Sequence, residues 1–161
     1  MSDSFDLQRF VDAQASIYRK VVEELSRGRK QTHWMWFIFP QIAGLGVSAM
    51  AQRFAIGSHA EAVAYLEHDL LGPRLVECTR LVMAASEKPV TDILGSPDDM
   101  KFRSCMTLFD AVSKQEIFAE AIAAFYPDGK DLRLGKFWKR AHPYSDRTPE
   151  TGNSAAAHLF F

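Results

Sequence analysis

Three polar residues on one predicted helix are of types, and at a spacing, that could bind a ligand or catalyse a reaction. Lys101, Ser104 and Thr107 follow one another at intervals of three residues, so they share one arc of a helix. An ammonium and two hydroxyls on one arc could bind an anionic or carbonyl group, or Lys101 could activate Ser104 as a nucleophile. The alternative, which we favour, is a partly exposed helix face whose hydroxyls bond back to the backbone.

A second group of candidates lies in the aromatic segment 30–41. His33 and Gln41 are polar residues near its two ends, and Trp34 and Trp36 lie between them. Aromatic faces bind planar or apolar ligands and a few polar groups orient them, so one interpretation is a pocket wall. The other is a central helix that is apolar on all sides, in which each buried indole N–H needs a polar partner. We interpret the middle of the segment as core and expect function at its polar ends.

Gly44, Gly46 and Ser48 precede another predicted helix. Backbone N–H groups in such a place can hold a phosphate. The dinucleotide fingerprint and the Walker spacing are both missing, however, so we favour a flexible turn in which Ser48 caps the helix.

The histidines and cysteines do not predict a metal centre or a cofactor. No pair of histidines has the HExxH spacing or another ligand spacing, and Cys78 and Cys105 are far apart. We expect both cysteines to be buried free thiols of a reducing compartment. Asp98 and Asp99 are accounted for by the dipole of the helix that they begin, so no catalytic residue is assigned.

The composition excludes several classes of protein. The chain has 161 residues, 47% of them hydrophobic and 24% charged, which is typical of a globular domain. Because its net charge is −1 and no basic stripe dominates, extensive nucleic-acid binding is not expected. The apolar run 34–39 is far shorter than the ~20 residues that span a bilayer, and the first residues lack the features of a signal peptide. These observations predict a cytoplasmic protein that does not enter the membrane.

Helices must position the candidate residues. Apolar residues recur with a helical period over residues 7–25, which indicates one long helix or two with a break near residues 13–16. Ser58 and Glu61 form a capping box at the start of a later helix. The residues Ser96-Pro97-Asp98-Asp99 start the helix that carries Lys101.

Almost no stretch alternates with the period of a strand, so the sequence predicts an all-α fold. We expect a compact single-domain bundle of about six to eight short helices over residues 1–140, with a last helical turn at 136–140. Residues 141–161 are rich in small and polar types and are expected to form a loosely packed tail.

Four motifs resemble one known family. Phe5–Phe10, Gly28–Gln41, Ala62–Leu75 and Asp99–Phe109 occur in the order found in a bacterial domain-of-unknown-function family, number eighteen-ten, over roughly residues 4–127. The resemblance implies a compact all-α fold without an established activity, and the end of the chain beyond about residue 135 departs from it. The family pattern includes positions that match His33, Trp36, Pro40, Gln41, Ser48, Lys101, Ser104 and Thr107.

Members of that family are sometimes labelled calpastatin, a protease inhibitor. Inhibitor segments of that kind are disordered and poor in large apolar residues, whereas 12% of this chain is aromatic and its helices carry caps. The sequence does not support the label.

The leading hypothesis is a binding or sensing protein for a small polar or nucleotide-like ligand. Its pocket would lie between the 33–41 helix and the 101–107 face, with Trp34 and Trp36 packing on the ligand, His33 and Gln41 orienting it, and Lys101 supplying charge.

Two alternatives come from other classes of protein. The first is a small hydrolase or transferase with His33 or Lys101 as general base and Ser104 or a water as nucleophile. The second is an interaction module that uses the late helices or residues 158–161. The sequence assigns no oligomeric state.

Overall fold

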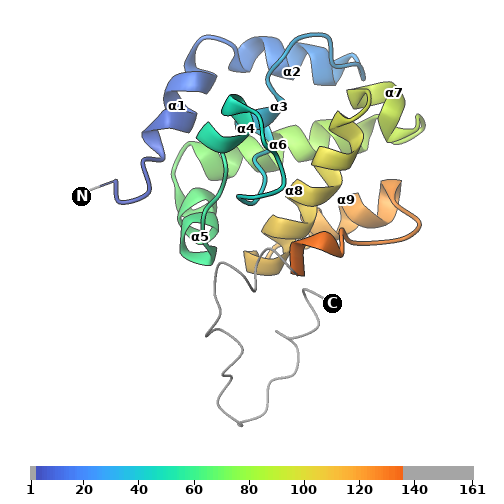
Figure 1. Cartoon of the computed structure of the whole chain (residues 1–161). Coiled ribbons are helices and arrows are strands. Elements are labelled where there is room, and N and C mark those ends of the chain that lie inside the picture. The colour runs from blue at the N-terminus through green and yellow to red at the C-terminus, as the bar shows by residue number, and fades with distance from the viewer. Residues whose placement is uncertain (1–2, 136–161) are drawn as a thin grey trace, which may run out of the picture.

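The all-α prediction is confirmed by a computed structural model, which describes residues 3–135 (Figure 1). No β-sheet occurs in this range, and a further helical turn begins at its last residues, 133–135. The turn expected at 136–140, the domain boundary at 140 and the tail at 141–161 lie outside the described residues. The helices are α1 (Gln8–Ala15), α2 (Tyr18–Ser26), α3 (Met35–Ile38), α4 (Ala49–Arg53), α5 (His59–Glu67), α6 (Leu71–Ala84), α7 (Val90–Leu94), α8 (Asp98–Val112) and α9 (Ile117–Phe125).

The core is a chain of aromatic rings contributed by four helices. Phe10 of α1 meets Tyr65 of α5 edge to face, with ring centres 5.1 Å apart. Tyr65 lies 5.3 Å from Phe109 of α8, which in turn lies 6.0 Å from Phe118 of α9. All four side chains are fully buried. The central helix α8, beside α9 in Figure 1, is thereby fixed on several sides.

The N-terminal periodicity resolves into two helices, as one of the two alternatives predicted. The break between α1 and α2 falls at residues 16–17. Gln14, near the end of α1, is buried and donates from Nε2 to the carbonyl oxygen of Phe37, 2.7 Å away. This bond ties α1 to the aromatic segment.

The aromatic segment is helical only over the single turn α3, so the prediction of a 33–41 helix was wrong in extent. Pro40 has no backbone N–H and disfavours helical geometry in the residue before it. Beyond Pro40 the backbone is extended, and two hydrogen bonds of 2.8 Å join Gln41 and Ala43 to Ile56. The predicted burial is confirmed for Trp34, Met35, Phe37, Ile38 and Phe39.

Two of the predicted helix starts have the expected residues, with different details. The Ser58 side chain accepts from the backbone N–H of Glu61 at 3.0 Å, and the Glu61 carboxylate accepts from Gly57 rather than from Ser58. The helix α8 begins at Asp98 with no side-chain cap.

Cys78 and Cys105 are buried free thiols, as predicted. Burial raises the pKa of Cys78 to about 12 and that of Cys105 well above its usual value, so neither thiol is activated.

Candidate functional site

A cleft of about 300 Å³ lies between α3, the loop that follows it, α4 and the first turn of α8. Its polar lining combines three side chains of residues 36–48 with one that is far away in the sequence. Trp36 belongs to α3, Gln41 and Ser48 to the loop and the N-cap of α4, and Lys101 to α8. The apolar lining consists of Met35, Phe39, Ile42, Leu45, Val47, Ala51 and Phe54, with Gly46.

Of the eight residues predicted to bind a ligand, the cleft therefore brings together Trp36, Gln41, Ser48 and Lys101. The other four, His33, Trp34, Ser104 and Thr107, do not line it. Lys101 is 30% exposed at its side chain, and Trp36 and Gln41 are half-buried. The cleft thus contains only half of the residues predicted for a pocket between residues 33–41 and 101–107.

Asp98 lies between two lysines, each of which is placed over a tryptophan. Lys30 Nζ is 3.0 Å from Asp98 Oδ2 and 5.1 Å from the centre of the Trp34 ring. Lys101 Nζ is 3.5 Å from Asp98 Oδ1 and 5.4 Å from the centre of the Trp36 ring. Both ring contacts are within the range of cation–π attraction. Asp98 therefore does more than complement the dipole of α8, which was the role expected from the sequence.

Trp34 is a core residue with the polar partner that its burial requires. Its side chain is fully buried, and its indole N–H donates to Oε1 of Glu24 at 3.2 Å. Glu24 also accepts from the backbone N–H of Gln31 and from the backbone and hydroxyl of Thr32. Burial alone would raise the pKa of Glu24, but the hydrogen bonds from Thr32, Gln31 and Trp34 outweigh it and lower that pKa. His33, in the same loop, is exposed.

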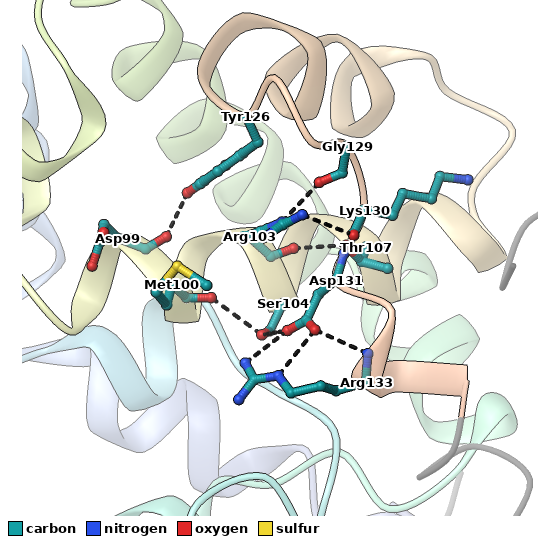
Figure 2. A network of polar contacts seen from close by, with 10 residues as sticks. All are labelled: Asp99, Met100, Arg103, Ser104, Thr107, Tyr126, Gly129, Lys130, Asp131 and Arg133. Atoms are coloured by element: carbon teal, nitrogen blue, oxygen red, sulfur yellow. Dashed lines mark hydrogen bonds and ion pairs between the residues drawn. The ribbon is translucent and has the colours of Figure 1, made fainter.

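Ser104 and Thr107 contact the backbone of their own helix, as the interpretation that we favoured predicted, but the same interpretation was wrong about exposure, since both side chains are buried. The Ser104 hydroxyl lies 3.2 Å from the carbonyl oxygen of Met100, and the Thr107 hydroxyl lies 2.8 Å from that of Arg103. Both also hold Asp131 (Figure 2). The Ser104 hydroxyl contacts the Asp131 carboxylate, and Thr107 Oγ1 accepts from the Asp131 backbone N–H at 3.0 Å.

Asp131 is the centre of a group of contacts that we call the clasp, formed by the buried residues Ser104, Thr107 and Asp131 and the exposed Arg133. Arg133 donates to the Asp131 carboxylate from Nε and Nη2, at 3.0 and 2.9 Å. Burial raises the pKa of Asp131, but the hydrogen bonds from Arg133 and Ser104 outweigh it and lower that pKa. Since Ser104 is only 1% exposed and its hydroxyl contacts Asp131, the Ser104–Lys101 pair considered as an alternative does not form.

Neither Glu24 nor Asp131 was a candidate from the sequence. Each is a single carboxylate with no motif around it. Glu24 finds its partners in the loop that follows α2, and Asp131 joins its neighbour Arg133 to Ser104 and Thr107 on the distant α8. For Glu24 one indirect signal was available, because a buried Trp34 requires a polar partner for its indole N–H.

A second hollow, wider and about 560 Å³ in volume, lies beside α7. It is lined by Arg29, Lys30, Lys88, Thr91, Asp92, Ile93 and Gly95. Arg29, Lys88 and Asp92 are exposed, and the hollow lacks the aromatic floor of the cleft.

Within residues 3–135, no group of three or more histidines, cysteines and carboxylates is arranged to hold a metal ion. No helix there is long and apolar enough to cross a membrane.

Fold and cleft together define a small all-α protein with one aromatic-lined cleft next to a shared ion pair. The chain belongs to the family described as protein of unknown function (DUF1810), whose model matches residues 4–135. This confirms the resemblance inferred from the four motifs. No curated protein matches the chain.

A solved structure is similar to this chain. It is the crystal structure of the conserved hypothetical protein Rv1873 from Mycobacterium tuberculosis, with a TM-score of 0.81 and 52% sequence identity. The match covers 83% of this chain and 96% of that one. The fold is therefore shared over almost the whole length of that protein.

Proposed function

We propose that this protein binds a small organic ligand in the cleft between α3, α4 and α8. The observation that carries the proposal is the convergence of Trp36, Gln41, Ser48 and Lys101 on one concave, largely apolar surface.

The lining has the composition of a small-ligand site. Such sites are mostly apolar and aromatic, with a few polar groups that fix orientation. Here Met35, Phe39 and Phe54 provide the apolar floor, and Trp36 and Lys101 stand at the edge. A volume of about 300 Å³ is at the lower end of the usual range for small-ligand pockets, so the ligand is a small molecule.

The walls of the cleft are held in place without a ligand. Phe39 packs edge to face on Phe102 of the core, with ring centres 5.0 Å apart, and Phe37 packs on Phe54 at 5.3 Å. The Ser48 side chain accepts from the backbone N–H of Ala51 and fixes the start of α4. A preformed site loses less conformational entropy when it binds, which favours affinity.

Thermal unfolding in the presence of a metabolite library tests the proposal. We expect some members to raise the melting temperature of the wild type and of Lys88→Ala, a control in the second hollow, but not that of Trp36→Ala. If every stabilising compound also stabilises Trp36→Ala to the same extent, the cleft is not the binding site.

A further inference from the structure

We infer that the ligand of the cleft is a small organic anion with a planar apolar body, and that Lys101 receives its anionic group. This inference rests on the proposed function of the cleft and names the chemical class of its ligand.

The charges of Asp98 and of its two lysine partners do not balance. Two ammonium groups, those of Lys30 and Lys101, share this one carboxylate, so two positive charges and one negative charge leave a net charge of +1. An anion that joins this group would neutralise it, whereas a cation would increase the imbalance.

Asp98 interacts more closely with Lys30 than with Lys101. Lys30 Nζ is nearer, at 3.0 Å against 3.5 Å for Lys101, and its side chain is only 8% exposed against 30%. A buried ammonium needs its counterion more than a partly exposed one, because water compensates it less. Asp98 therefore neutralises mainly Lys30, and the Lys101 ammonium can bind a second anionic group.

The polar groups that line the cleft suit an anion. Among the lining residues, all of which lie within residues 3–135, Lys101 is the only charged side chain. The Ser48 hydroxyl accepts from Ala51 and retains its own proton for donation, and the Gln41 amide supplies two N–H donors. Ammonium, amide and hydroxyl donors together match a carboxylate or a similar oxyanion.

The apolar part of the lining suits a flat ligand. The rings of Trp36, Phe39 and Phe54 and the thioether of Met35 line the same small volume. Aromatic side chains pack well on flat rings. A plain inorganic anion would leave this apolar surface unused, whereas an aryl carboxylate would use both parts of the cleft.

Three probes of nearly the same shape but different charge test the inference: 2-naphthoate, 2-naphthamide and 2-naphthamidine. Their affinities are measured by titration calorimetry on the full chain at low ionic strength. We expect 2-naphthoate to bind about tenfold more tightly than the neutral amide, and the cationic amidine to bind most weakly. The preference for the anion should weaken as salt is added, since Lys101 is partly exposed.

Variants locate the charge that is responsible. Lys101→Met should remove the preference while keeping the affinity for 2-naphthamide, which also shows that the variant is folded. Lys20→Met, an exposed lysine on α2, and Lys88→Met in the second hollow are the matched controls and should keep the preference.

The outcomes separate the inference from the proposed function. Equal affinity for amide and naphthoate, with Trp36→Ala abolishing both, overturns the inference and leaves the cleft as a binding site. Loss of the preference in Lys88→Met but not in Lys101→Met assigns the anion to the second hollow and also overturns the inference. Failure of all three probes to bind the wild type does the same, whereas the proposed function is decided by the metabolite library.

Discussion

The ammonium of Lys101 lies 5.4 Å from the centre of the Trp36 ring, and both groups line the same cleft. The neighbouring pair, Lys30 over Trp34, has almost the same geometry, but its tryptophan is fully buried in the core and the Lys30 side chain is only 8% exposed. Asp98 joins the two pairs. Two similar lysine–tryptophan contacts thus have different surroundings, which leads to different expectations for their mutation.

The two tryptophans should differ in their effect on stability. Trp34→Phe removes a fully buried indole and its hydrogen bond to Glu24, so we expect a loss of about 1–3 kcal/mol. Trp36→Phe affects a half-buried side chain and should cost less than about 1 kcal/mol. Urea unfolding followed by circular dichroism measures both, and equal losses would contradict the assignment of Trp34 to the core and of Trp36 to the cleft.

Asp98→Asn should have opposite effects on stability and on anion binding. The substitution leaves the buried Lys30 ammonium without its counterion, which should cost about 3 kcal/mol of stability. It also leaves Lys101 free of its shared carboxylate, so the affinity for 2-naphthoate should increase. The matched control is Asp92→Asn, an exposed carboxylate on α7, which should change neither quantity. A decrease in anion affinity in Asp98→Asn would mean that Asp98 helps to bind the ligand instead of competing with it.

The clasp should stabilise the protein without affecting the cleft. Ser104→Ala removes one contact of the buried Asp131 carboxylate, which keeps its bonds from Arg133, and we expect a loss of roughly 1–2 kcal/mol. Ser86→Ala, at an exposed position, is the control and should be within about 0.5 kcal/mol of the wild type. Loss of ligand binding in Ser104→Ala, with stability unchanged, would instead support the catalytic or binding role first considered for Ser104.

Acid should destabilise the fold through Glu24 and Asp131. Burial opposes ionisation of both carboxyls, but their hydrogen bonds outweigh it and lower both pKa values in the folded state. A lowered folded pKa gives stability that is fully present above the unfolded value, near 4.5 for Glu and 3.8 for Asp, and is lost as the pH falls through the folded value.

Urea unfolding at a series of pH values from about 7 to about 3 measures this dependence. Glu24→Gln should be less stable than the wild type at neutral pH and should lose less stability on acidification. A curve for Glu24→Gln that runs parallel to that of the wild type would show that Glu24 contributes no pH dependence.

Sequence signals that act over a few residues correctly predicted helix starts and breaks. The Ser58 cap and the break between α1 and α2 depend on neighbours within a few residues and were confirmed. The extent of α3 was wrong because Pro40 ends the helix and Ile56, a distant residue, pairs with the chain beyond it.

The candidate site was predicted in part for the same reason. Trp36, Gln41, Ser48 and Lys101 could be selected because their side-chain chemistry is visible without a fold. Ser104 could not be separated from them, since its partner Asp131 reaches it only after α9 has packed beside α8. The sharing of Asp98 with Lys30 was hidden in the same way.

The most direct test of the central claim is methyl NMR of the full chain with selectively labelled methionine and isoleucine during titration with small organic compounds. Met35 and Ile42 line the cleft, and Met106, fully buried in α8, is an internal reference. We expect at least one compound to shift the Met35 and Ile42 methyl signals to saturation while Met106 stays unchanged. If compounds that bind shift only signals outside the cleft, or no compound shifts Met35 and Ile42, the cleft is not the ligand-binding site of this protein.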